Sequence, residues 1–259
     1  MNKLMPLSKV CQLARNLKSF SDALFRTIMS QATLREILYH YIDWRDQRYI
    51  KQTIDRVPPA SLRFRVHGDV NIYSFLEAGK GCSQDIIESL FTVQTDINSF
   101  RNILDFGCGC GRTIIWFADK ANQVQFHGTD VDADAIEWCR QNLDFAKFEV
   151  NESVPPLRYP TNSFDLVYAI SVFTHLNEDY QFRWLAELQR VTKPKGYVLL
   201  TLRGSYYSNG MEATELEELA KTGFLYKEEA KFMQRDISEV VSGRVSHPGV
   251  CTLQIFKLF

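Results

Sequence analysis

The sequence predicts a doubly wound α/β fold with a mostly parallel sheet, preceded by a helical appendage. Three features predict it. A glycine-rich turn within residues 101–120 follows a short apolar strand and leads into a helix. From residue 102 onward, apolar strand-like segments alternate with helical ones, as in sheets covered by helices on both faces. Before residue 58 the apolar positions recur at helical spacing. We therefore expect an appendage at residues 1–60 and one α/β domain at residues 61–259.

The composition is compatible with this class and disfavours others. The 259 residues are 45% apolar with a formal net charge of -1, enough for a large core but without a basic field for nucleic acid. The six cysteines form no CxxC or Cys/His cluster, so we expect no metal site and a reducing, cytoplasmic setting. No apolar run is long enough to cross a bilayer and no signal-peptide core is present, so no membrane partner is expected.

The segments before the glycine turn are expected to form the helical appendage and then a short strand and a helix that precede the sheet. Helices are expected up to Pro58-Pro59, where the two prolines end them. This appendage either packs on the core or forms a lid over a substrate pocket, and the two roles are compatible. In residues 63–67, arginine and histidine alternate with apolar residues, which predicts a strand edge whose arginines are solvated or meet a ligand carboxylate. A helix is expected at Gln84–Thr92.

The glycine turn is the centre of the predicted domain. Phe106 ends an apolar strand, Gly107, Gly109 and Gly111 follow, and a helix begins near Thr113. Glycine permits positive φ and leaves room for a ligand, and a helix N-terminus offers free N–H groups. The pattern is typical of a nucleotide-binding turn.

The spacing of the glycines argues against a dinucleotide. A GxGxxG fingerprint would place its third glycine where Arg112 stands, but Gly111 comes one residue earlier. Asp105 precedes the turn, and a carboxylate there would repel a pyrophosphate and attract a cation. A NAD(P)-dependent oxidoreductase therefore remains only as an alternative.

The segments after the turn alternate as a doubly wound sheet requires. The last segment, 250–258, has apolar residues at both odd and even positions, which predicts a strand that is buried on both faces in the centre of the sheet. The expected strands are 124–130, 148–151, 164–171, 197–202, 239–241 and 250–258, the expected helices are 135–142, 180–191 and 216–220, and a turn is expected at 193–196.

Asp130 ends the second strand about 20 residues after the glycine turn. Nucleoside-binding α/β folds place an acid there to accept hydrogen bonds from ribose hydroxyls. The alternative role is the N-cap of the following helix, but Asp132 and Asp134 are also available for that role. We therefore favour the ribose.

Taken in order, these motifs resemble a known family. The glycine turn, GTDVD, NSFDLVYAISVFTHL, RWLAELQRV and KPKGYVLLT resemble the class I S-adenosylmethionine (SAM) methyltransferases, in the subgroup that acts on small molecules. The resemblance covers about Phe64–Leu202 and leaves residues 1–57 unexplained. It implies a seven-stranded sheet with an antiparallel last strand inserted. Lys195 stands where the family usually has a second turn glycine, and we expect it to be a solvated turn residue.

The resemblance also implies a cofactor and the residues that bind it. The cofactor is SAM, whose methionine end lies by Asp105 and whose adenine lies by Asn151 or Glu152 at the end of the third strand. The implied cofactor-binding residues are Asp105, Gly107, Cys108, Gly109, Asp130, Val131, Asn151, Glu152 and Ile170.

The acceptor is less well defined by the sequence. No D/N-P-P-Y/F motif follows the fourth strand, which disfavours bases, and a Pro-Cys pair for cytosine chemistry is also absent there. We expect methyl transfer to an oxygen or nitrogen of a small molecule, in a pocket lined by aromatic residues. The candidates for this lining are Tyr168, Phe173, Tyr206 and Tyr207.

His175 is the candidate catalytic residue. It follows the fourth strand at the carboxyl edge of the sheet, and histidine titrates near neutral pH, so it is suited to accept the acceptor's proton. Its alternative role is to cap the next helix or to bond a backbone carbonyl. A non-catalytic SAM-binding module remains the second alternative for the whole domain, although the glycine turn and Asp130 are intact.

Overall fold

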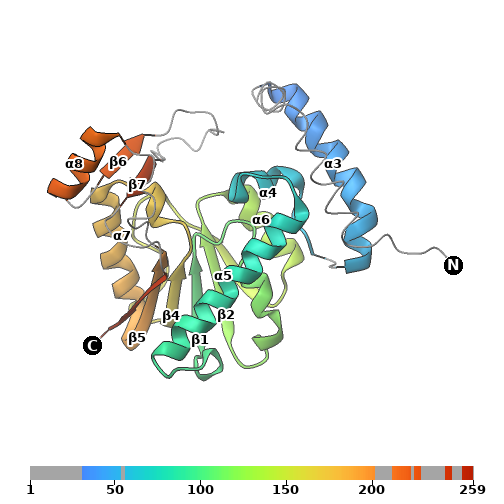
Figure 1. The fold of residues 1–259 in the computed structure, drawn as a ribbon. Helices are drawn as coiled ribbons and strands as arrows, with labels where there is room; N and C mark the ends of the chain where they lie inside the picture. Colours follow the sequence, from blue (N-terminus) through green and yellow to red (C-terminus); the bar gives the residue numbers. More distant parts are fainter. Residues whose placement is uncertain are drawn as a thin grey trace. The chain divides into compact units, whose positions relative to one another are not determined.

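A computed structural model describes residues 31–53, 56–201, 212–222, 225–228, 243–246 and 253–258 (Figure 1). The chain forms two compact units, Met1–Phe75 and Leu76–Phe259. The boundary between them falls within helix α5 (Ile72–Thr92).

The first unit is helical where it is described. Helix α3 (Ala32–Thr53) and helix α4 (Ala60–His67) share a small core of Tyr39, Ile42 and Ala60. Helix α4 ends at Gly68, which has a φ of 74° and donates its N–H to the carbonyl of Phe64.

The expectation of a strand edge at residues 63–67 is wrong, because this segment lies in α4. Arg63 is fully buried, and its guanidinium donates to Oδ2 of Asp46 and to the carbonyl of Pro58, each at 2.7 Å. A five-residue alternation of apolar and basic residues is too short to exclude a helix. The buried ion pair occupies Arg63, which is one of the two arginines of this segment that are candidates for a ligand carboxylate.

The second unit is built on a six-stranded sheet with the order β3-β2-β1-β4-β5-β8. All neighbouring strands are parallel except β8, which pairs antiparallel with β5. The doubly wound, mostly parallel fold is therefore confirmed. The strands are β1 (Asn102–Phe106), β2 (Gln125–Asp130), β3 (Ala146–Val150), β4 (Phe164–Ala169), β5 (Thr192–Thr201) and β8 (Leu253–Lys257).

The number and order of strands differ from the expectation at the C-terminal end. Six strands rather than seven form this sheet in the described part of the chain, and β6 (Leu225–Glu228) pairs with β7 (Gly243–Ser246) in a separate two-stranded sheet. The expected strand at 239–241 lies outside the described residues. Among the described strands β8 is last in the sheet order, and its Phe256 is 45% exposed, so within the described part of the chain the strand expected to be central at 250–258 lies at the edge of the sheet.

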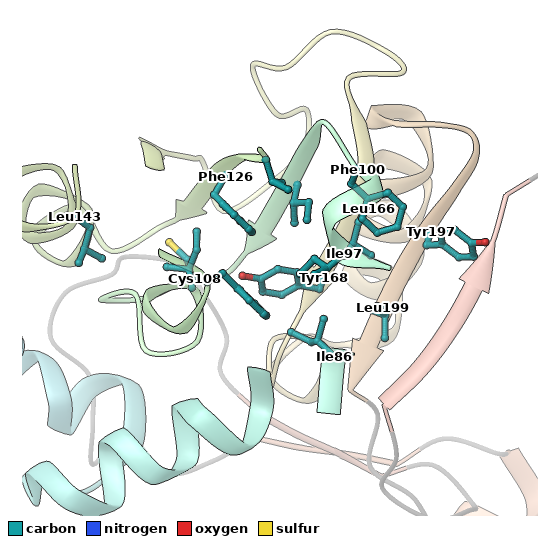
Figure 2. Packing of buried hydrophobic residues seen from close by; sticks show 14 of the residues in the cluster. Ile86, Ile97, Phe100, Cys108, Phe126, Leu143, Leu166, Tyr168, Tyr197 and Leu199 are labelled. Carbon is teal, nitrogen blue, oxygen red and sulfur yellow. The ribbon is translucent and has the colours of Figure 1, made fainter. Parts of the chain in front are cut away.

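Two apolar layers enclose the sheet. One face packs against α5, the 3₁₀ helix η2 (Ile114–Lys120) and α6 (Ala133–Asn142), and Figure 2 shows side chains of this cluster. The other face packs against α7 (Glu178–Val191) through Trp184, Leu188 and Val191. Shorter elements are η1 (Ile97–Ser99), η3 (Phe173–His175) and α8 (Ala213–Thr222).

The expected turn at 193–196 is an irregularity within β5. Phe164 pairs with Thr192 and Leu166 with Tyr197, so five residues of β5 span two residues of β4. Lys195 has a φ of 65° and is exposed. The extra residues form a bulge there, and the strand resumes at Gly196, whose carbonyl accepts a hydrogen bond from the amide of Leu258.

Candidate functional site

The glycine turn after β1 is fixed by its neighbour β2. Gly107, Gly109 and Gly111 have φ values of 75°, 52° and 77°, which side chains rarely tolerate. The amides of Gly107 and Cys108 donate to the carbonyl of Thr129, at 2.8 and 3.1 Å. The turn is therefore held in place by backbone bonds, and Cys108 places its thiol in the core.

Asp130 at the end of β2 completes this anchoring. Its Oδ2 accepts from the amide of Gly109 at 2.7 Å, and its Oδ1 accepts from the amide of Asp132 at 2.9 Å. Burial raises the pKa of Asp130, although the backbone donors act in the opposite direction. Asp132 is the N-cap of α6, accepting from the amides of residues 134 and 135. A carboxylate has four lone pairs, so Asp130 can still accept a hydrogen bond from a ligand hydroxyl beside its backbone donors.

Asp105 lies at the carboxyl end of β1 and is 2% exposed. Its Oδ2 is buried and has no hydrogen-bond partner among the described residues. The pKa of Asp105 is raised to about 8, mainly by burial. The Tyr168 hydroxyl acts to lower this pKa, and the Asp130 carboxylate acts to raise it further. Arg112 in the glycine turn also lowers it. A buried carboxyl of this kind is a candidate for binding a cationic group.

The segment after β4 closes onto the glycine turn. Ser171 has a φ of 62° and donates its amide to Oγ1 of Thr201. The next residue, Val172, places its Cγ2 only 2.2 Å from where a Cβ on Gly107 would lie. Ile170 is partly buried against the core of the α5 face. His175 is exposed in η3.

The helix that follows His175 has its own cap. The side chain of Asn177 accepts from the amide of Tyr180 at the start of α7. Gln181 donates to the carbonyls of Phe173 and Leu176. The N-cap of α7 is therefore Asn177, not His175.

The end of β3 carries the residues expected at the adenine. Oδ1 of Asn151 accepts from Oγ1 of Thr129 at 2.8 Å, and its Nδ2 donates to the carbonyl of Glu152 at 2.7 Å. The amide of Asn151 donates to the carbonyl of Asp130, which ties the end of β3 to the end of β2. A small hollow opens here, lined by Thr129, Glu149, Val150, Asn151, Glu152, Pro156, Leu157, Arg158 and Tyr159.

The structure brings most of the expected residues to one edge of the sheet. Asp105, the glycine turn and Asp130 with Val131 lie at or just after the ends of β1 and β2, and Asn151 and Glu152 follow β3. Ile170 and His175 follow β4. This carboxyl edge is where open α/β sheets bind ligands.

The aromatic residues expected to line an acceptor pocket do not do so where they are described, and several contacts of the glycine turn were not expected. Tyr168 and Phe173 are buried in the two cores, so they do not line an open pocket, and residues 206 and 207 lie outside the described part. Sequence reasoning missed the Thr129 carbonyl and the Val172 contact, for which the sequence has no local signal. It also missed the Tyr168 hydroxyl, although the parallel apolar strands placed that residue beside Asp105.

Comparisons with known proteins find similarity to methyltransferases. Residues 103–196 match the family model described as methyltransferase domain. The chain is 24% identical over 172 residues to fatty-acid O-methyltransferase of Mycolicibacterium smegmatis, covering 64% of this chain and 58% of that protein. It is 28% identical over 126 residues to methyltransferase GfsG of Streptomyces halstedii, covering 46% and 42%. The chain thus spans less than two thirds of the length of these relatives.

A solved structure of a SAM-dependent methyltransferase from Methanosarcina mazei aligns with a TM-score of 0.41 and 21% identity, over 57% of this chain and 73% of that chain. Within the described residues, no helix combines the length and hydropathy needed to cross a membrane. In the same residues, no three His, Cys, Asp or Glu side chains are placed to hold a metal ion.

Proposed function

This chain belongs to the class I SAM-dependent methyltransferases, and we propose that it transfers the methyl group of SAM to an oxygen or nitrogen of a small-molecule acceptor. The observation that carries the proposal is the buried, unpartnered Oδ2 of Asp105 beside the glycine turn. SAM has an ammonium, a sulfonium and no phosphate, so a carboxyl group at this position suits it and does not suit a dinucleotide.

The residues at the carboxyl edge fit the rest of this cofactor. We assign the ribose hydroxyls to the remaining lone pairs of Asp130 and the adenine to Asn151 and Glu152, next to Val131 and Ile170. The polar side chain of Asn151 and the backbone near it suit the donor and acceptor groups of adenine. Gly107, Cys108 and Gly109 shape the turn against which the methionine part would lie.

Catalysis then depends mainly on alignment. Bound SAM supplies a methyl group on a good leaving group, and the chain must hold the acceptor atom in line with it. We propose that His175 accepts the proton that the acceptor loses. His175 lies at the same edge of the sheet and is not the cap of α7. An amine acceptor that is already deprotonated would need no such base.

The acceptor class is a proposal supported by relatives. One of them is named a fatty-acid O-methyltransferase and another an ajmaline N-methyltransferase. We infer a small organic acceptor, with a carboxylate, hydroxyl or amine as the methylated group.

Calorimetric titration with SAM and with NAD tests the cofactor. We expect a Kd for SAM in the micromolar range, about −8 kcal/mol, and no binding of NAD. Incubation with methyl-labelled SAM and a panel of fatty acids, phenols and amines then tests transfer. Tight NAD binding would support the oxidoreductase alternative. SAM binding without labelled product from any acceptor class would support a non-catalytic module.

We also propose that residues 1–60 serve as an appendage that acts on the acceptor side, since the family model begins at residue 103. Deletion of residues 1–57 removes Asp46, which is the ion-pair partner of Arg63, so the truncated chain should be made both with and without Arg63→Met. We expect the truncated chain to bind SAM and to lose methyl transfer. Retention of both would show that the appendage is not a lid.

A further inference from the structure

We propose that Tyr168 is a positioning residue for Asp105, and that binding of the cationic cofactor is coupled to release of the Asp105 proton to solvent. The inference rests on the proposed function, because it takes SAM as the ligand. The O–H bond of the carboxyl group breaks, the proton goes to bulk water, and the carboxylate remains to face the ligand's positive charge.

The geometry begins with the register of the sheet. Asp105 on β1 and Tyr168 on β4 are partners in the parallel pairing, so their side chains project from the same face. This face also carries Ile103 and Leu166, and it is the one covered by α5, η2 and α6. Tyr168 is fully buried and Asp105 nearly so.

Both side chains end in a polar atom that the described residues leave unsatisfied. These atoms are Oδ2 of Asp105 and the hydroxyl oxygen of Tyr168. The ring of Tyr168 packs edge-on against Phe117, with centroids 6.2 Å apart, so the position of the hydroxyl oxygen is fixed while its hydrogen can still rotate. Figure 2 shows this hydroxyl at the end of the ring nearer Cys108, the residue that follows Gly107 in the turn. Two unsatisfied buried polar atoms on paired residues of neighbouring strands indicate a site that is completed by something else.

The titratable groups around Asp105 lie on four parts of the fold, which are β2, the glycine turn, α5 and α6. The Asp130 carboxylate on β2 disfavours ionisation, and the Arg112 guanidinium in the glycine turn favours it. The thiols that interact with Asp105 are Cys82 on α5, Cys108 in the turn and Cys139 on α6, and burial raises the pKa of all three, so they are neutral. Burial is the largest influence, and it raises the pKa of Asp105 to about 8. The carboxyl group is therefore protonated at neutral pH until a cation arrives.

Tyr168 and burial have opposite effects on the pKa of Asp105. The Tyr168 hydroxyl makes no hydrogen bond to Asp105 in the structure, but it belongs to the paired residue of the next strand and lowers the pKa of Asp105, because a nearby donor stabilises the carboxylate more than the acid. Burial raises the pKa of Tyr168 well above 10, so the phenol keeps its proton and remains a donor at neutral pH. Without it, ionisation of Asp105 would require a higher pH.

The experiment is calorimetric titration of SAM into the wild type, Tyr168→Phe and Asp105→Asn between pH 6 and 8.5, each in two buffers of different ionisation enthalpy. The α-amino group of SAM also titrates in this range. The proton released by Asp105 is therefore the difference between the wild type and Asp105→Asn. Tyr197→Phe is the matched control, because its hydroxyl bonds Thr95.

We expect the wild type to release close to one more proton than Asp105→Asn at pH 6.5, and SAM affinity to rise as pH approaches 8. Tyr168→Phe should move this rise to higher pH and weaken binding about tenfold at pH 7, while Tyr197→Phe matches the wild type. Equal proton release by the wild type and Asp105→Asn would overturn the coupling. An unchanged pH profile in Tyr168→Phe would overturn the role of Tyr168.

Thermal unfolding without ligand gives a second readout that does not depend on SAM. The folded protein holds the Asp105 proton between the unfolded pKa near 3.9 and about 8, so its stability should fall relative to Asp105→Asn as pH rises through this window. Tyr168→Phe should extend the fall to higher pH. If SAM binds at no pH, the proposed function fails, while these unfolding profiles still decide whether Tyr168 controls Asp105.

Discussion

The amide of Gly109 donates a 2.7 Å hydrogen bond to Oδ2 of Asp130, so the turn after β1 is held by the last residue of β2. The same carboxylate accepts from the amide of Asp132. We expect Asp130→Ala to weaken SAM binding by roughly 1.5–3 kcal/mol and to lower the free energy of unfolding by about 1–3 kcal/mol, because two amides lose their acceptor. Calorimetry and urea denaturation measure the two effects separately.

Asp130→Asn is the control for this prediction. It keeps one carbonyl oxygen and its size, so its loss of stability should be smaller than that of Asp130→Ala. If Asp130→Ala loses stability but binds SAM with unchanged affinity, Asp130 anchors the turn and does not bind the ribose.

Gly107 combines a φ of 75° with a close neighbour, since an added Cβ would lie 2.2 Å from Cγ2 of Val172. Gly68 has nearly the same φ, 74°, but no atom lies within 4 Å of its added Cβ. Gly68→Ala should therefore cost only the conformational strain, about 1–2 kcal/mol, and Gly107→Ala should cost more and abolish SAM binding.

Urea denaturation of both variants and SAM titration of Gly107→Ala test this comparison. The double variant Gly107→Ala with Val172→Ala should recover part of the difference, because the contacting methyl groups are removed. Equal losses of stability in Gly107→Ala and Gly68→Ala would show that Val172 moves aside without cost.

The sheet could be predicted where its signals are local. Strands β1 and β4 are short, mostly apolar runs, and the observed bounds of β2 and β4 agree with the expected ones to within two residues. The glycine turn and Asp130 follow from spacing along the chain. These features do not depend on which distant segment packs against them.

The structure differs from the expectations where residues far apart in the sequence determine the local conformation. Arg63 is buried because Asp46, 17 residues earlier, neutralises it, and this pairing is invisible to a count of alternating residues. The Thr129 carbonyl that holds the turn is a backbone group, so no side-chain pattern identifies it. The contact of Val172 with Gly107 requires knowledge of how the segment after β4 folds back. The site residues could be named from the motif, but the contacts that hold them could not.

Lys195 has a φ of 65° at an exposed position in β5, where the resembling family usually has glycine. A non-glycine residue pays for this conformation, so Lys195→Gly should raise the free energy of unfolding by up to about 1 kcal/mol, partly offset by the greater freedom of glycine in the unfolded chain. Lys195→Ala keeps the strain and should be close to the wild type. Urea midpoints decide the order, and a glycine variant less stable than the alanine variant would contradict it.

His175 gives the prediction that concerns catalysis itself. It lies in η3 after β4, exposed, while Asn177 caps α7. If it accepts the acceptor's proton, His175→Ala should lower kcat by roughly 10²–10⁴ and leave the Kd of SAM within a few-fold. At saturating SAM, which removes the influence of cofactor affinity, the wild-type kcat should rise with pH across the range where histidines ordinarily titrate. His175→Gln separates the two roles, because glutamine keeps a hydrogen-bonding group but is not a base near neutral pH. A glutamine variant that retains most of the wild-type kcat would assign His175 to hydrogen bonding in the scaffold.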